Sequence, residues 1–575
     1  MRHGLSPVCA VPCRFIYMDG KQLANDVAAG LLDLTLQQWQ AMKRWVEAQR
    51  STPGAILAVG DVFPLALACL ASHHSTTLSA AAASSTAPAA SPPPALPFAF
   101  MGTAKSEFYI RGDDARLLPS QATTSVERWW HGGGVYHPWE RWLMAHSCCR
   151  LAAVRDRLTA QVLAQNMPLE EASPSASSSF YPGTVQDGSE AGLFRRGKVA
   201  YLGNPMMDHM SPSPHLHSFI CTLRAWIHHR TTPAVDSAGG ADTTAPHGAS
   251  SSAAACQGSS SSPFRHVFAI LPGSRPPEVY SNWDLLTSSI PHLVSSLPPC
   301  SGGTSTNMSS TSTGSSSSSS SNLTSNSPLP VLFVCPIVPS LPPSLFASPL
   351  LAQGWLPVPP SRPSLEGERE QAEEGWEELG DGGSLQGRVF FLPGGEEGEA
   401  DKEEHGRGWA EQHSIVAALE GPHEEGKSGV GDERGSAAVE GSSGGAARSG
   451  VRSIGGARAV LVLVRGGFAE CAHEAHGALA MAGTASEQMV GLGKPVFIIP
   501  GKGPQFTAVF AEAQTRLLGK SVILSNSPEE LGAAAAATMA DAALLQEIAA
   551  NGRIRMGGPG GARQIATAVL DDLLW

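Results

Sequence analysis

Three short loops in the second half of the chain combine glycine with side chains that can bind phosphate. They are Gly273-Ser274-Arg275, Gly483-Thr484-Ala485-Ser486 and Gly501-Lys502-Gly503-Pro504-Gln505. Glycine lets backbone N–H groups approach an anion closely, and a helix that begins near Ser486 would add the positive end of its dipole. With the charges of Arg275 and Lys502, the loops predict a cradle for a diphosphate. A single Gly-rich turn is usually only structural, so the prediction depends on three of them occurring in one half.

Asp61 is the candidate catalytic residue of the first half. It ends the apolar run 55–61, "AILAVGD", which predicts a buried strand. A partly desolvated carboxylate at the end of such a strand has a raised pKa, which suits a general base. Asp61 could equally be the N-cap of the following helix, so both interpretations stay open at this point.

The segment 137–142, "HPWERW", is a second candidate contact on this side. Its tryptophans could form an aromatic platform for an acceptor, with Glu140 as a polar contact. Packing of Trp139 and Trp142 in the core is the more ordinary interpretation, and we expect it.

The chain lacks the sequence signatures of several other functional classes. The chain has no GxGxxG dinucleotide fingerprint and no GxxxxGK[ST] loop, which argues against dehydrogenases and P-loop kinases. No HExxH or similar spacing predicts a metal site, so we expect neither metal nor cofactor. The ten cysteines form no CxxC pair and are expected to be ordinary thiols. No basic cluster with interleaved aromatic residues occurs, so we expect no nucleic-acid partner.

Short apolar runs alternate with helical patterns through both halves, which predicts an α/β fold with doubly wound parallel sheets. The predicted strands lie in the segments 55–61, 97–103, 149–154, 199–208, 265–275, 330–337, 388–394, 458–464, 478–483 and 495–501. Each loop of the proposed cradle follows one of these strands. In open parallel sheets, ligands bind at the carboxyl ends of the strands.

Low-complexity stretches interrupt this pattern and are expected to be disordered insertions, because they cannot bury enough apolar surface. They lie at about 74–96, 172–190, 301–328 and 365–457. The last is rich in Glu and carries much of the net charge of −12. We therefore predict an N-terminal domain over 1–208, a largely disordered linker over 209–263, and a C-terminal domain over 264–575.

The longest apolar run, 55–71, is too short to span a bilayer and contains Asp61 and Pro64. No transmembrane helix is expected, although this segment would suit a peripheral contact with a membrane. Residues 1–20 do not form a good signal peptide, because their apolar stretch is short and interrupted.

Several motifs together resemble those of lipid-A-disaccharide synthase-related proteins of cyanobacteria and photosynthetic eukaryotes. More distantly, they are similar to lipid-A-disaccharide synthase itself. The motifs cover nearly all of the foldable chain; the most specific of them is the block 480–519, and the others include "FIYMDGKQLANDVAAGLLDLTLQQ", "LAVGDVFPLALA", "YLGNPMMD", "LPGSR", "VRGGFAE" and "RMGGPGGARQIA".

The resemblance implies a GT-B glycosyltransferase, with two Rossmann-like domains facing a cleft. A UDP-sugar would bind the C-terminal domain, and an acceptor, which could be a lipid, the N-terminal one. The implied donor residues are Gly273, Ser274, Arg275, Gly483, Thr484, Ala485, Ser486, Gln488 and Gln505. Gln488 stands where the related enzyme has a glutamate that meets the ribose, and Asp61 falls near the position of the catalytic base. A plastid location is also implied for a photosynthetic source, and otherwise a cytoplasmic one.

One departure from the family concerns the start of the chain. Family members begin with a strand and a Gly-rich "SNGHGED"-like loop well before the equivalent of "FIYM", whereas this chain begins close to that point. The resemblance therefore predicts an incomplete N-terminal domain.

The combined hypothesis is an inverting transfer of a hexosyl or N-acetylhexosaminyl group from a UDP-sugar. Two alternatives stay open. One is a UDP-sugar epimerase of GT-B fold, which would release UDP without an acceptor. The other is a non-catalytic nucleotide-sugar-binding protein.

Overall fold

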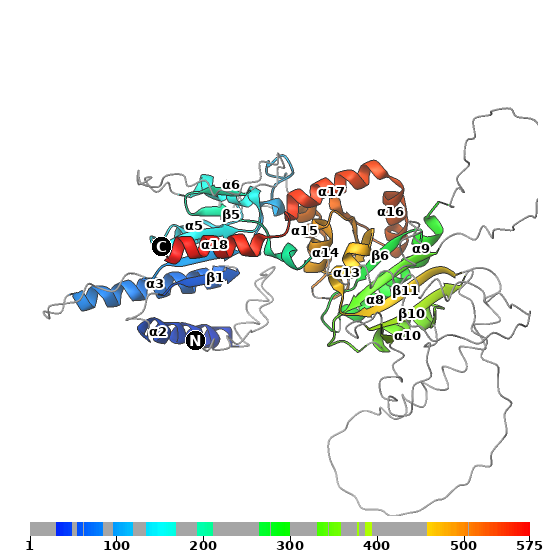
Figure 1. Ribbon diagram of the computed structural model, residues 1–575, viewed down its shortest axis with the longest axis horizontal. Helices are drawn as coiled ribbons and strands as arrows, with labels where there is room; N and C mark the ends of the chain where they lie inside the picture. The colour runs from blue at the N-terminus through cyan, green and yellow to red at the C-terminus, as the bar shows by residue number, and fades with distance from the viewer. Residues whose placement is uncertain are drawn as a thin grey trace, which may run out of the picture.

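The structure is a computed structural model of the chain. The residues that it describes are 30–48, 54–60, 62–83, 96–118, 134–167, 193–210, 264–276, 278–298, 330–342, 344–357, 377–378, 386–393, 457–503 and 505–574. They form two α/β units, each built around its own sheet (Figure 1).

The sheet of the N-terminal unit has five strands in the order β1-β2-β3-β5-β4. They are β1 (Ile56–Gly60), β2 (Phe98–Gly102), β3 (Cys149–Val154), β5 (Val199–Tyr201) and β4 (Phe194–Arg196). The first four are parallel, and β4 is antiparallel to β5. Most residues of β2, β3 and β5 are buried, as expected for strands covered on both faces.

Helices cover one face of this sheet along much of its width. α3 (Val62–Ala83), α5 (Pro138–Met144) and α6 (Arg157–Asn166) contribute Leu65, Met144 and Leu163 to a core that contains Phe98 and Phe100. α2 (Leu31–Ala48) packs on α3 through Val46 and Ala71. A 3-10 turn, η1 (Glu107–Tyr109), follows β2.

The sheet of the C-terminal unit runs in the order β14-β13-β12-β6-β7-β11-β10-β8. Its strands are β6 (Val267–Leu271), β7 (Val331–Ile337), β8 (Leu356–Pro357), β10 (Gln386–Pro393), β11 (Ala457–Arg465), β12 (Gly477–Ala480), β13 (Val496–Ile498) and β14 (Val522–Leu524), with β9 (Glu377–Glu378) paired to β10. From β14 to β11 the strands are parallel, whereas β10 is antiparallel to both β11 and β8.

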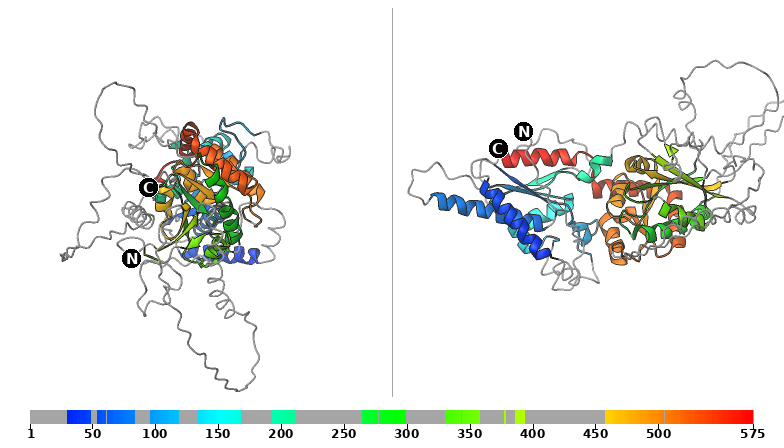
Figure 2. Two further views of the ribbon diagram at one scale, coloured as in Figure 1. Left: turned by 90° about the vertical axis from the view of Figure 1, so that its right-hand side faces the viewer. Right: turned by 90° about the horizontal axis from the view of Figure 1, so that it is seen from below.

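Helices lie on both faces of this second sheet (Figure 2). One group is α8 (Glu278–Ser288), α9 (Ile290–Ser296), α10 (Ser344–Ala352) and α16 (Pro528–Ala540). The other is α13 (Phe468–Glu474), α14 (Thr484–Gly491), α15 (Ala508–Leu518) and α17 (Ala542–Met556). The fully buried side chains of Trp283, Phe333 and Phe497 lie in one continuous core.

The last helix, α18 (Gly561–Leu574), leaves the C-terminal unit and returns to the N-terminal sheet (Figure 1). Ile565 and Ala568 pack there on Leu151 and Ala153, on the face opposite to α3 and α6. The predicted α/β fold class is therefore confirmed: both sheets are mainly parallel and have helices on both faces. The strand order reverses direction, as in a doubly wound sheet, in the C-terminal unit, and the chain ends by crossing back to its first unit.

Each predicted strand segment overlaps a strand of the structure, but four short strands were not predicted. They are β4, β8, β9 and β14, of two or three residues each. α3 continues to Ala83, into the range where we expected an insertion, and β9 and β10 lie within the range 365–457. The domain limits themselves stay predictions.

The prediction that Trp139 and Trp142 pack in the core is wrong. Trp142 is 70% exposed and Trp139 is 43% exposed, because α5 turns this side toward solvent and buries Glu140 and Met144 instead. Within the described residues, no helix has both the length and the hydropathy needed to cross a membrane.

Candidate functional site

The strand order places two of the predicted loops at the switch point of the C-terminal sheet. From β6 the chain moves to β7 on one side, while β12, β13 and β14 follow one another on the other side. The loops after β6 and β12 therefore lie next to each other at the carboxyl edge, and the loop after β13 is next in line. Open α/β sheets bind their ligands at such a point.

The first two loops are in direct contact. The N–H group of Met481, just after β12, donates to the carbonyl oxygen of Leu271 at 2.8 Å. Gly273 has φ of +100°, and a Cβ there would lie 3.5 Å from the Met481 oxygen. The positive φ favours glycine here, whereas a Cβ at this distance would make an ordinary van der Waals contact. The side chains of Ser274 and Arg275 are exposed at this edge.

The second loop leads into a helix whose N-terminus has no side-chain cap. Gly483 is the N-cap of α14, and the first helical backbone bond runs from the Glu487 N–H to the Gly483 oxygen. The N–H groups at the start of a helix have no partner within it, and they form a natural anion site. Thr484 is exposed here, and Ala485 is half-buried. The Ser486 hydroxyl instead donates to the Ala482 oxygen at 2.5 Å.

The third loop is closed by a backbone hydrogen bond of its own and by Glu278. The Gly501 N–H donates to the Phe506 oxygen at 2.7 Å. The N–H groups of Gln505 and Phe506 both donate to the Glu278 carboxylate. These two backbone donors are therefore occupied, and the loop offers a ligand the exposed side chain of Lys502 and the half-buried side chain of Gln505.

Behind its first turn, α14 is fixed to the N-terminal unit. Glu487 forms an ion pair of 2.9 Å with Arg155, which follows β3, and both side chains are buried. The Gln488 amide donates to the Met206 oxygen at 3.0 Å, in η2 (Pro205–Met210). Gln488 thus has a contact between the units, and its expected contact with a ribose stays a prediction.

Of the two residues predicted on the N-terminal side, Glu140 is described by the structure and Asp61 is not. Asp61 lies outside the described residues, between the last residue of β1 and the first of α3, so its role stays a prediction. Glu140 is 1% exposed. Its carboxylate accepts from Lys105 at 2.6 and 2.8 Å and from the His137 N–H at 2.7 Å, so it caps α5.

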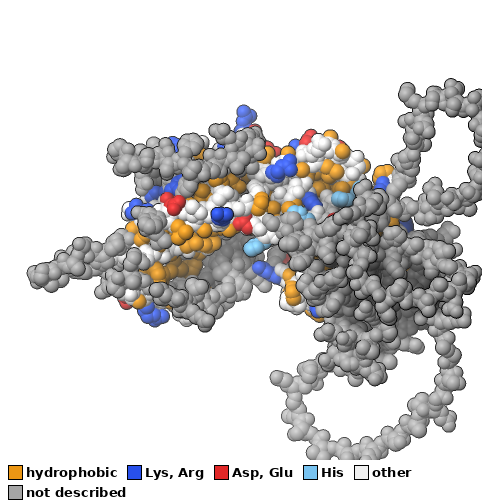
Figure 3. Space-filling model, in the orientation of Figure 1, with side chains coloured by type: hydrophobic (Ala, Val, Ile, Leu, Met, Phe, Trp, Pro, Cys, Tyr) orange, Lys and Arg blue, Asp and Glu red, His pale blue; other side chains and the backbone are white. Residues whose placement is uncertain are grey.

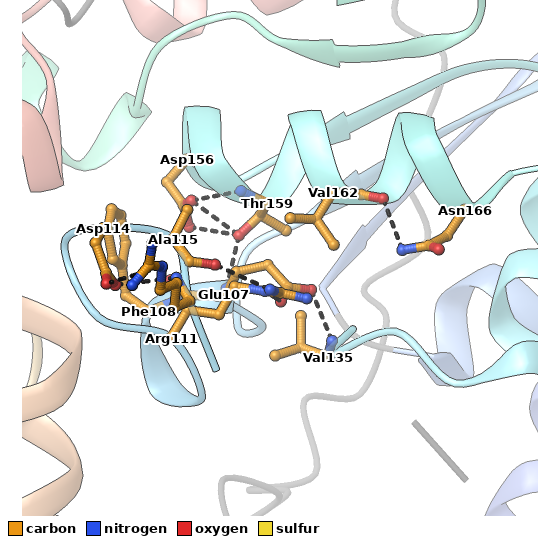
Figure 4. A network of polar contacts seen from close by, with 12 residues as sticks. Glu107, Phe108, Arg111, Asp114, Ala115, Val135, Asp156, Thr159, Val162 and Asn166 are labelled. Carbon is orange, nitrogen blue, oxygen red and sulfur yellow. Dashed lines mark hydrogen bonds and ion pairs between the residues drawn. The ribbon is translucent and has the colours of Figure 1, made fainter. Parts of the chain in front are cut away.

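A buried polar network that the sequence did not predict fixes η1 against α6 (Figure 4). The Glu107 carboxylate accepts from the Val135 N–H at 2.7 Å and from Arg111 Nε at 2.8 Å, while burial raises its pKa. The Thr159 hydroxyl accepts from the Glu107 N–H and donates to Asp156, the N-cap of α6. Beside this network is a cavity of about 300 Å³ whose lining includes Arg111, Gln161, Gln165 and Asn166.

Apolar side chains gather on the surface of the N-terminal unit over α18 and β1 (Figure 3). Leu57 and Val59 on β1 are each 48% exposed, and Leu570 on α18 is 51% exposed. β1 is the edge strand of its sheet, and α18 packs on β2, β3 and β5 on this face.

No family model and no curated protein matches the chain. Among solved structures, it is similar to a protein from Listeria monocytogenes that is provisionally described as a UDP-N-acetylglucosamine 2-epimerase. The identity is 11% and the TM-score 0.35, over 94% of this chain and 80% of the other. A likeness at this level carries no argument about function.

Proposed function

We propose that the C-terminal unit binds the diphosphate of a nucleotide sugar. The observation that carries this proposal is the meeting of the loops after β6 and β12 at the switch point of a parallel sheet, with the glycine-containing loop after β13 beside them. Arg275, Lys502 and the uncapped start of α14 bring positive charge to one edge. The donor residues predicted from the sequence, Gly273, Ser274, Gly483, Thr484 and Ala485, belong to this edge.

For the reaction, we propose an inverting transfer similar to that of lipid-A-disaccharide synthase. Asp61 would take the proton of an acceptor hydroxyl as its oxygen attacks the anomeric carbon of the sugar. The bond from that carbon to the UDP oxygen breaks, and UDP leaves with an additional negative charge. The free N–H groups of α14 and the Arg275 guanidinium would stabilise that charge.

The acceptor side of the proposal rests on exposed apolar groups. Trp139 and Trp142 project from α5, which Glu140 holds in place, and they could form the aromatic platform considered from the sequence. Within the apolar segment 55–71, Leu57, Val59, Phe63 and Leu70 are at least 37% exposed. These groups favour a lipid acceptor and a peripheral contact with a membrane.

The donor site is tested by titrating the full chain with UDP in a calorimeter. We expect binding, and we expect Arg275→Ala to weaken it about tenfold or more, because a charge-assisted hydrogen bond contributes about 1.5–3 kcal/mol. Arg563→Ala is the matched control, since Arg563 is exposed on α18 away from the three loops. Equal affinities of wild type and Arg275→Ala would remove Arg275 from the site.

The reaction is tested by incubating the protein with UDP-sugars and a membrane lipid extract. Transfer of the sugar to a lipid supports the proposal, and Asp61→Asn should then abolish it. Release of UDP without an acceptor would instead indicate an epimerase. UDP binding without any turnover would indicate a binding protein. Full transfer by Asp61→Asn would exclude Asp61 as the base.

A further inference from the structure

Glu278 connects two parts of the C-terminal unit that are far apart in the sequence. It is the first residue of α8 and is 8% exposed. One oxygen of its carboxylate, Oε1, accepts the N–H of Gln505 at 3.0 Å and that of Phe506 at 2.7 Å. A carboxylate that accepts two backbone N–H groups forms charge-assisted hydrogen bonds, which are stronger than neutral ones.

The loop after β13 closes tightly around this carboxylate. A Cβ at Gly503 would lie 2.5 Å from Glu278 Oε1, so any side chain there would collide with it. A Cβ at Gly501 would lie 2.7 Å from Met481 Cε and 2.9 Å from Asn282 Oδ1. The two glycines therefore allow the loop to pass directly over α8 and the end of β12.

Asn282 holds the neighbouring loop from the next turn of the same helix. Its side-chain Nδ2 donates to the Pro272 oxygen at 3.0 Å, immediately before Gly273. Asn282 is 2% exposed and follows Glu278 by four residues, so both side chains lie on one face of α8. α8 thus fixes the loop after β6 with one side chain and the loop after β13 with the other.

We propose that Glu278 is a positioning residue of the donor site, an inference that rests on the proposed function. Its carboxylate occupies the backbone donors of Gln505 and Phe506 and so sets the conformation in which Lys502 and Gln505 face the ligand. Phosphate is then bound by the loops 273–275 and 483–486, while the third loop contributes side chains only.

The test compares wild type with Glu278→Gln, which keeps the shape of the side chain but removes its charge. Glu512→Gln is the matched control, because Glu512 is 52% exposed on α15 and pairs with Arg516 on its own helix. Three quantities are measured on the full chain: UDP affinity, the rate of tryptic cleavage after Lys502, and the free energy of unfolding. The unfolding measurement separates a loss of global stability from a local effect on the loop.

We expect Glu278→Gln to weaken UDP binding about tenfold and to speed cleavage after Lys502 several-fold, while Glu512→Gln changes neither. Unchanged UDP affinity in Glu278→Gln would overturn the positioning role, even if cleavage were faster. If wild type fails to bind UDP, the proposed function fails. In that case the cleavage rate alone tests whether Glu278 positions the loop, and an unchanged rate in Glu278→Gln would overturn that role too.

Discussion

Four carboxylates that are almost fully buried fix turns in the two units. They are Glu107, Glu140, Asp156 and Glu487. Each is paired: with a backbone N–H, with a cation, or with both. Removing the partner of a buried charge is far more harmful than removing a pair on the surface. At the scale of single residues, these carboxylates hold η1, α5, α6 and α14 where the sheets end.

The environment of His266, at the amino edge of the C-terminal sheet, predicts that stability depends on pH. Burial first, and then the charges of His476 and Arg265, lower the pKa of His266 from 6.5 to about 4. Between these two values the unfolded chain binds a proton that the folded chain does not, so stability falls as the pH drops from 6.5 to 4. A fall from 6.5 to about 4 would correspond to about 3.4 kcal/mol at 1.36 kcal/mol per pKa unit, and solvent screening of the half-buried ring makes the contribution smaller.

We therefore expect His266→Asn to flatten the loss of unfolding free energy across this range, measured by urea denaturation at several pH values. His209→Asn provides the control, because His209 is exposed in η2. Parallel curves for wild type and His266→Asn would show that His266 does not contribute.

At the scale of elements, glycine determines how closely α14 approaches its neighbours. A Cβ at Gly552, in the middle of α17, would overlap the carbonyl group of Val490 on α14. A Cβ at Gly491 would overlap the Met207 side chain on η2. α14, which begins at the proposed phosphate site, is therefore packed between α17 and η2 so closely that a Cβ at Gly491 or Gly552 would not fit.

This packing predicts that Gly552→Ala is destabilising by about 1–3 kcal/mol, the usual effect of overpacking. Intrinsic helix propensity alone would predict the opposite, a gain of about 1 kcal/mol. Chemical denaturation distinguishes the two signs. Gly558→Ala should be close to neutral, because nothing lies within 4 Å of a Cβ at that position. A gain in stability for Gly552→Ala would mean that α14 can move away freely.

At the scale of the whole molecule, polar contacts from several elements join the two units. Asp208 in η2 accepts the N–H groups of Gly560, Gly561 and Ala562 and so caps α18. Arg555, at the end of α17, contacts Asp113, and its guanidinium carbon Cζ lies 3.7 Å from the centre of the Phe108 ring. The Arg155–Glu487 pair and the Gln488–Met206 hydrogen bond connect α14 to the N-terminal unit.

We expect Asp208→Ala to weaken the return of α18 to the N-terminal sheet. Loss of an N-cap costs about 0.5–2 kcal/mol. Hydrogen exchange of the amides in 561–574 should therefore become faster. Asp541→Ala serves as the control, since Asp541 caps α17 within the C-terminal unit. It should leave exchange in α18 unchanged, and equal effects of the two substitutions would contradict a specific joint at Asp208.

The sequence alone determined most of the elements and the loops of the candidate site. Long apolar runs such as those of β6 and β11 can only be satisfied inside a sheet, and small residues after a strand identify a turn. The short strand β14 was missed because three residues carry no periodic signal. The exposure of Trp142 was missed because residue type does not show which side of a short helix faces the core.

Only the tertiary structure decided which loops meet. Strand order brings residues 273 and 483 together at a switch point, and no local pattern records that order. The same holds for Glu278 and Gln505, which are 227 residues apart, and for Asp208 and the start of α18. Local composition fixes what each segment can become, whereas the pairing of distant segments depends on burying all their apolar faces at once.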